Sequence, residues 1–126
     1  MIYKFTKIQE KKIIEHWGQD IFLNILRDIE SCSKKWQLTN LEFYEHYSIN
    51  AIFFCKSEIY GDCVLEIYDD DEIMPEYNTL LEYNNKGGFY VKVLGYEPGD
   101  HSNGAILIER VFPGKWLIDE ENLYYR

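Results

Sequence analysis

The chain has little of three things that would place it outside ordinary globular proteins: proline, paired cysteine and long apolar runs. It has three prolines and three cysteines in 126 residues. Its apolar runs are short, as at residues 51–54, and none approaches the roughly 20 residues of a membrane-spanning helix. No cationic stretch followed by an apolar one opens the chain. The sequence therefore predicts neither secretion nor membrane insertion.

The cysteines and histidines form neither a disulfide framework nor a metal-ligand pattern. Cys32, Cys55 and Cys63 are odd in number and lack C-x-x-C spacing. The three histidines are far apart, and none stands at a local His/Cys ligand spacing. We therefore expect three buried thiols, rather than metal-binding or catalytic ones, in a reducing, cytoplasmic setting.

Basic residues are scarce relative to acidic ones. Lysine and arginine number 13 against 22 aspartates and glutamates, which gives a net charge of -9 at pH 7. Such a field repels nucleic acid and anionic membranes, so we expect neither as a partner. The 46% hydrophobic and 28% charged fractions indicate a soluble globular chain, and 126 residues suffice for one modest core.

The first third of the sequence has helical patterning. Thr6 and Gln9 have the spacing of a capping box, which predicts a helix start. Gly18 is expected to break the helix, and Asp20 to cap a second one that runs to about Lys34. Apolar residues recur every four positions and form one stripe: Ile13, Trp17, Ile21, Ile25 and Ile29.

Beyond Leu38 the pattern becomes strand-like. We expect a hairpin of strands at residues 38–46 and 49–56, a turn at 60–62, and a third strand at 63–68. In that third strand Cys63, Leu65 and Ile67 should share one face. Two further strands are expected at residues 89–94 and 105–111, joined by the turn-rich segment 95–104.

A further helix is expected between the third and fourth strands. Pro75 suits a first helical turn, and residues 76–84 have helical composition. The acidic run at 69–72 is interpreted as a solvated loop rather than a cation site. The sequence thus predicts an α+β fold, with an antiparallel sheet of about five strands, one packed helix, and the N-terminal helices outside. We divide it into a helical extension (1–37), a lobe (38–114) and a connector (115–126).

Four stretches make this order more specific. They are Trp36-x-Leu38, residues 60–67, Glu76-x-x-x-Leu80, and residues 104–114, of which 107–114 are the most specific. Together they resemble the nucleotide-binding, amino-terminal lobe of the protein-kinase-like fold. Within it they are similar to the aminoglycoside and hydroxyurea resistance kinases, which include streptomycin phosphotransferases. The resemblance covers most of the chain.

This resemblance implies a phosphotransferase that uses ATP and magnesium to phosphorylate a hydroxyl of an aminoglycoside-like or hydroxyurea-like acceptor. In such kinases adenine pairs with backbone groups of the hinge, which here would be those of Glu109 and Val111. The third strand normally ends in a lysine that neutralises the phosphates, and a helix glutamate, matched by Glu76, holds that lysine. At the lysine position this sequence has Glu66.

Glu66 is the most informative departure from the family pattern. A carboxylate that faces a triphosphate repels it, and a second carboxylate at Glu76 adds like charge, so we expect ATP affinity to suffer. Two alternatives stay open. Glu66 could point into solvent from a strand of different register, or Lys56 on the preceding strand could supply the missing cation.

A second departure concerns catalysis. No histidine has an aspartate two positions on, the expected first hairpin has no glycine, and Arg126 follows soon after the expected hinge. We therefore expect a truncated kinase lobe that is inactive alone. The alternative is a small acidic cytosolic interaction module that keeps the lobe fold. It would bind a protein partner, or a second copy, through an uncovered cleft face that includes Ile108, Phe112 and Trp116.

Overall fold

A computed structural model describes residues 3–45, 47, 50–68, 92–98 and 104–110. Within these residues the chain forms two helices and five strands, which confirms the α+β class. The expected helix at 75–84 lies outside the described residues. So do Glu76, Val111, Phe112 and Trp116, the acidic run at 69–72 and the connector at 115–126.

Helix α1 (Lys7–Trp17) begins at the predicted capping box. The Thr6 hydroxyl accepts a hydrogen bond from the Gln9 backbone at 3.1 Å, and the Gln9 side chain accepts one from the Thr6 backbone at 3.0 Å. The helix ends at Gly18, whose φ of 98° is one that a side chain would strain. Both local predictions are confirmed.

Helix α2 (Gln19–Trp36) begins earlier than the sequence indicated. Its N-cap is Gly18, which has no side chain that could cap the helix, so the prediction that Asp20 caps it is wrong. Asp20 instead lies in the first turn, where its carboxylate still favours the positive end of the helix. The helix extends to Trp36, and Gln37 ends it in a left-handed conformation with φ 52°.

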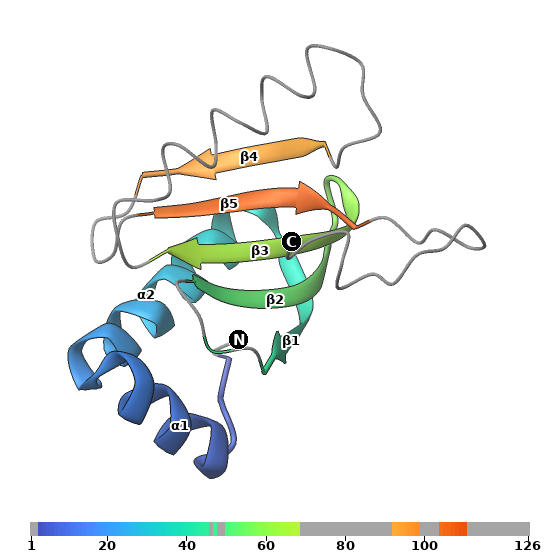
Figure 1. Cartoon of the computed structure of the whole chain (residues 1–126). Coiled ribbons are helices and arrows are strands. Elements are labelled where there is room, and N and C mark those ends of the chain that lie inside the picture. Colours follow the sequence, from blue (N-terminus) through green and yellow to red (C-terminus); the bar gives the residue numbers. More distant parts are fainter. Residues whose placement is uncertain (1–2, 46, 48–49, 69–91, 99–103, 111–126) are drawn as a thin grey trace.

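Five antiparallel strands form one sheet in the order β1-β2-β3-β5-β4 (Figure 1). Their bounds are β1 Leu38–Tyr44, β2 Asn50–Ser57, β3 Gly61–Tyr68, β4 Val93–Glu97 and β5 Gly104–Glu109. The antiparallel sheet of five strands is therefore confirmed. The insertion of β5 between β3 and β4 makes the third and last strands direct neighbours.

Two turn predictions are corrected. The turn between β2 and β3 occupies residues 58–60 rather than 60–62. The Ser57 hydroxyl stabilises the 58–60 turn, because it accepts hydrogen bonds from the backbone N–H groups of Ile59 and Tyr60. It also donates a hydrogen bond to the Trp36 carbonyl at 2.6 Å. Gly95, expected to start a turn-rich segment, is instead a residue of β4.

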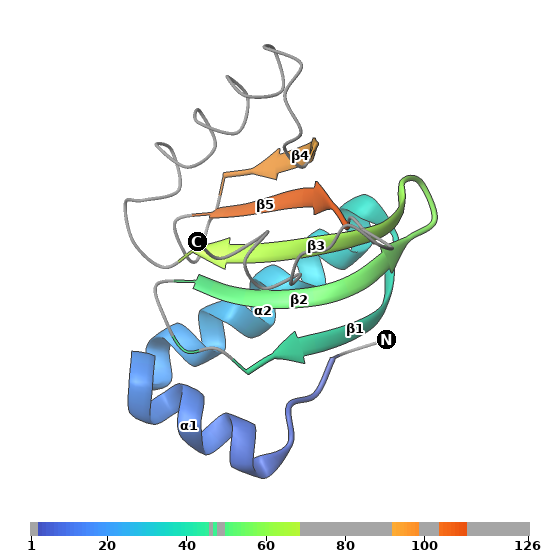
Figure 2. The same ribbon diagram turned by 45° about the vertical axis from the view of Figure 1, so that its right-hand side comes forward.

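The two faces of the sheet belong to two apolar clusters. Both helices lie on one side of the sheet (Figure 2), and side chains from that side, such as Phe53 and Leu65, share a core with Ile25 of α2. Cys63, Leu65 and Ile67 all face this core, as predicted. Within the described part of the chain, neither helix is long and apolar enough to cross a membrane.

Candidate functional site on the second sheet face

The sheet face opposite the helices contains Glu66, which stands at the position where the family resemblance implied a phosphate-binding lysine. Alternation along β2, β3 and β5 directs every second side chain to this side. We call it the second face, and its members on these three strands include Asn50, Ile52, Phe54, Lys56, Val64, Glu66, Tyr68, Ile106 and Ile108.

Glu66 lies in the middle of the second face. Its Cα partners are Ile52 on β2 and Ile106 on β5. It is only 5% exposed, so the solvent-facing alternative is wrong. Burying a carboxylate among apolar side chains is costly unless polar groups compensate.

Asn50 supplies one such compensating group. Its Nδ2 donates a hydrogen bond to Oε1 of Glu66 at 2.9 Å, and both residues are buried. Asn50 pairs with Tyr68, so it is diagonal to Glu66 across the hairpin. The sequence reading missed Asn50, although hairpin register and strand alternation would have placed it near Glu66.

Lys56 is on the second face by strand alternation but does not lie beside Glu66. It pairs with Asp62, whereas Glu66 pairs with Ile52, four residues earlier on β2. At about 3.3 Å per residue, this separation is about 13 Å along the strand. Lys56 is also exposed. The structure therefore does not bring this candidate cation to Glu66.

The end of β5 lies next to the start of β3. Glu109 pairs with Cys63, and the Arg110 backbone N–H donates to the Asp62 carbonyl at 3.0 Å. The Glu109 backbone N–H is already engaged, because it donates to the Lys92 carbonyl at 2.9 Å. The Glu109 N–H is therefore not available for an adenine contact, and Val111, the other residue expected to make one, lies outside the described residues.

Arg110 is a cation that the sequence reading missed. Its guanidinium lies 4.1 Å from the centre of the Phe54 ring, within cation–π range. Because Phe54 pairs with Val64, this places a positive charge near the end of β5 rather than beside Glu66.

Most apolar members of the second face are buried, whereas Phe54 is only partly buried. Val64 and Ile106 are fully buried, and Ile108 is 3% exposed. For Ile108 the expectation of an uncovered cleft residue is therefore wrong. The other two residues named for that cleft, Phe112 and Trp116, lie outside the described residues.

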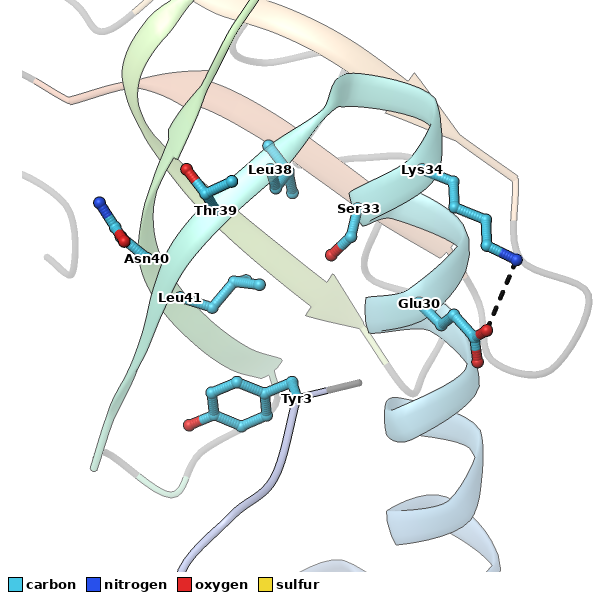
Figure 3. A pocket seen from close by; sticks show the side chains of 8 residues that line it. All are labelled: Tyr3, Glu30, Ser33, Lys34, Leu38, Thr39, Asn40 and Leu41. Atoms are coloured by element: carbon cyan, nitrogen blue, oxygen red, sulfur yellow. Dashed lines mark ion pairs between the residues drawn. The ribbon is translucent and has the colours of Figure 1, made fainter. Parts of the chain in front are cut away.

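A separate cavity of about 400 Å³ lies between the last turns of α2 and the start of β1 (Figure 3). Its wall includes the Glu30–Lys34 ion pair, at 3.5 Å, and Ser33, whose buried hydroxyl has no hydrogen-bond partner among the described residues. A β-bulge between Thr39 and Glu42 shapes the β1 side. The lining is Tyr3, Glu30, Ser33, Lys34, Leu38, Thr39, Asn40 and Leu41.

This cavity lacks the composition of a catalytic centre. Its two charged groups neutralise each other, and Figure 3 shows them paired along α2 rather than directed at the β1 wall. Among the residues that the structure describes, no group of three or more His, Cys, Asp or Glu side chains could hold a metal ion. The second face remains the better candidate site.

Comparison with known proteins found no matching family model and no matching curated protein.

Proposed function

We propose that the chain is the nucleotide-lobe part of a small-molecule kinase of the aminoglycoside and hydroxyurea resistance type, in which position 66 no longer serves the phosphates of ATP. The pairing of β3 with β5 is the observation that supports this proposal. One nucleotide must touch both the third strand and the hinge, so these two must be neighbours. Sequence order alone does not make them so, because β4 comes between them in the chain.

The register along β3 supports the same arrangement. Cys63 pairs with Glu109 at the hinge end, and Val64 with Ile108 form an apolar pair on the second face. Glu66 follows three residues after Cys63, about 10 Å along the strand. This is a distance that a nucleoside 5′-phosphate spans, with adenine at the hinge and phosphate near position 66.

The chemistry at position 66 opposes phosphate binding. Glu66 offers a carboxylate, its neighbour Asn50 offers a neutral amide, and Lys56 is about 13 Å away along the strand, opposite Asp62. A unit charge about 6 Å from a phosphate contributes about 3 kcal/mol at an effective dielectric of 20, and here its sign is unfavourable. The proposal therefore expects the adenosine part of the nucleotide to be recognised and the triphosphate to weaken binding.

Calorimetric titration with adenosine, ADP and ATP, the last two with magnesium, tests this proposal. The parent chain should bind adenosine more tightly than ATP. Glu66→Gln keeps an oxygen acceptor for Asn50 but removes the charge, so it should raise ATP affinity at least about tenfold and leave adenosine affinity unchanged. Lys56→Ala is the matched control and should change neither affinity.

Two results would reject the proposal. If neither the parent nor Glu66→Gln binds any of the three ligands, the nucleotide-lobe assignment fails. If ATP binds the parent more tightly than adenosine and Lys56→Ala abolishes that preference, Lys56 supplies the cation and Glu66 is not disabling.

One observation favours a second candidate, an interaction module that keeps the fold without nucleotide chemistry. On the second face Val64, Ile106 and Ile108 are buried, so these three side chains offer no exposed apolar surface to a protein partner. Exposed apolar side chains instead occur at the tip of the β2–β3 hairpin, where Ile59 is 51% and Tyr60 44% exposed. Sedimentation of the parent against an Ile59→Ser/Tyr60→Ser double variant tests self-association through this tip. Identical monomeric behaviour would exclude self-association there.

A further inference from the structure

The β2–β3 hairpin holds two thiols in contact on the helix side of the sheet. Strands β2 and β3 lie side by side (Figure 1), and Cys55 and Cys63 are Cα partners in their register. Their Sγ atoms lie 3.5 Å apart, and the Cys55 thiol also donates to the Cys63 carbonyl at 3.7 Å. All three cysteines are free and buried.

The backbone geometry suits a bond between these sulfurs. Directly opposed Cα atoms in an antiparallel pair are about 4.5–5.5 Å apart. A disulfide needs Cα atoms about 4.4–6.8 Å apart and sulfurs at about 2.05 Å. Closing the pair therefore requires side-chain rotation rather than movement of the strands.

We propose that Cys55 and Cys63 form a redox modification site, which a low-molecular-weight disulfide of the glutathione type oxidises to a cross-strand disulfide. The thiolate of Cys63 attacks one sulfur of the small disulfide and expels one small thiolate. The thiolate of Cys55 then attacks Sγ of Cys63 in the mixed disulfide and expels the second. Two protein thiols lose two protons and two electrons, and one small disulfide becomes two small thiols.

The asymmetry of the pair supports this order of attack. The hydrogen bond between the two thiols lowers the pKa of Cys63, whereas the same bond, followed by burial, raises the pKa of Cys55. Cys63 therefore ionises first, and the thiolate is the reactive form. Both side chains are buried, so the small disulfide reaches them through local opening of the hairpin.

Cys32 provides an internal control. It lies on α2 in the same apolar cluster, and burial, then the charges of Asp28 and Glu97, raise its pKa to about 12. A thiol with so little thiolate at neutral pH should remain reduced under the same conditions.

Equilibration of the intact chain in glutathione redox buffers, with and without denaturing urea, tests the proposal. After acid quenching, thiols are alkylated in denaturant and counted by mass, and peptides are mapped. In the folded chain two thiols should no longer be alkylated, peptide mapping should show a Cys55–Cys63 disulfide, and the Cys32 thiol should still be alkylated. Because the native hairpin holds the two sulfurs close together, the equilibrium constant for oxidation of the folded chain should exceed that of the unfolded chain at least tenfold.

Variants add a matched comparison. Cys32→Ala should retain the disulfide, whereas Cys55→Ala should form none. The proposal is overturned if all three thiols of the folded parent stay alkylatable, if Cys32 takes part in the bond, or if the folded chain is no easier to oxidise at equilibrium than the unfolded one. That last comparison uses only the parent chain, so it holds even if Cys55→Ala does not fold. None of these outcomes depends on nucleotide binding.

Discussion

The indole of Trp36 occupies the space that a side chain at position 95 would need. A Cβ on Gly95 would lie 2.7 Å from Cε2 and Cζ2 of Trp36, closer than real Cβ contacts come. Trp36 ends α2 and Gly95 lies in β4, so this contact joins the long helix to an edge strand. The neighbouring Lys35–Glu97 ion pair links the same two elements.

Gly95→Ala should therefore lower the free energy of unfolding by about 1–3 kcal/mol, the usual cost of overpacking. Urea unfolding measures this loss. Lys35→Ala is the matched control, because it weakens the same junction at an exposed ion pair and should cost no more than about 1 kcal/mol. In a Trp36→Leu background, with the indole gone, Gly95→Ala should cost much less. Equal costs in the two backgrounds would show that the indole is not the cause.

The Asn50–Glu66 hydrogen bond should contribute measurably to stability. Asn50→Ala should cost about 1.5–3 kcal/mol, because it removes a donor from a buried carboxylate. In a Glu66→Gln background the acceptor is neutral, and the same change should cost only about 0.5–1.5 kcal/mol. Urea unfolding of the four chains gives both values. Equal losses would mean that the charge of Glu66 is not what Asn50 stabilises.

Asn50→Asp should be more damaging at neutral pH than Asn50→Ala, because it sets a second carboxylate beside Glu66. The penalty should shrink as the pH falls toward 4, since protonation of one carboxyl removes the repulsion and restores a donor. Thermal unfolding at pH 7 and near pH 4 compares the two variants. A penalty that is independent of pH would contradict close contact between the two side chains.

Cys32 should make the fold sensitive to alkali. Burial raises the pKa of its thiol from 9.0 to about 12, so above pH 9 the unfolded chain loses this proton while the folded chain keeps it. The contribution to stability is complete below pH 9 and is lost as pH rises toward 12, at about 1.4 kcal/mol per pH unit. Between pH 9 and 10.5 the free energy of unfolding of Cys32→Ala should fall by between about 1 and 2 kcal/mol less than that of the parent, as measured by urea unfolding under reducing conditions. Parallel losses would contradict the prediction.

Removal of the Thr6 cap should destabilise α1. Thr6→Ala deletes the hydroxyl that accepts the Gln9 N–H and should cost about 1 kcal/mol. Thr6→Ser keeps that hydroxyl and should stay within a few tenths of a kcal/mol of the parent. Urea unfolding checks both variants. If serine is as damaging as alanine, the hydroxyl is not the stabilising group.

Features that depend on a few adjacent residues were predictable from the sequence. The capping box at Thr6, the break at Gly18 and the common face of Cys63, Leu65 and Ile67 all agree with the structure. Each depends on backbone geometry within a turn or along a strand, where the helical period of 3.6 or the strand period of 2 decides which way a side chain points. The kinase-lobe assignment and the roles of Glu76 and Val111 remain predictions.

Features that depend on residues far apart in the chain were decided only by the tertiary structure. The turn occupies residues 58–60 rather than 60–62, and Ser57, which precedes it, donates a hydrogen bond to the Trp36 carbonyl. Gly95 is a strand residue, and the Trp36 indole fills the space that a side chain there would occupy. The burial of Glu66 against Asn50 likewise depends on how two strands align. Such contacts follow from packing and strand register, which local propensity does not contain. For that reason the sequence alone indicated where the sheet begins and which residues could face a ligand. Only the tertiary structure decided that the Glu66 side chain is buried and that Lys56 does not lie beside it.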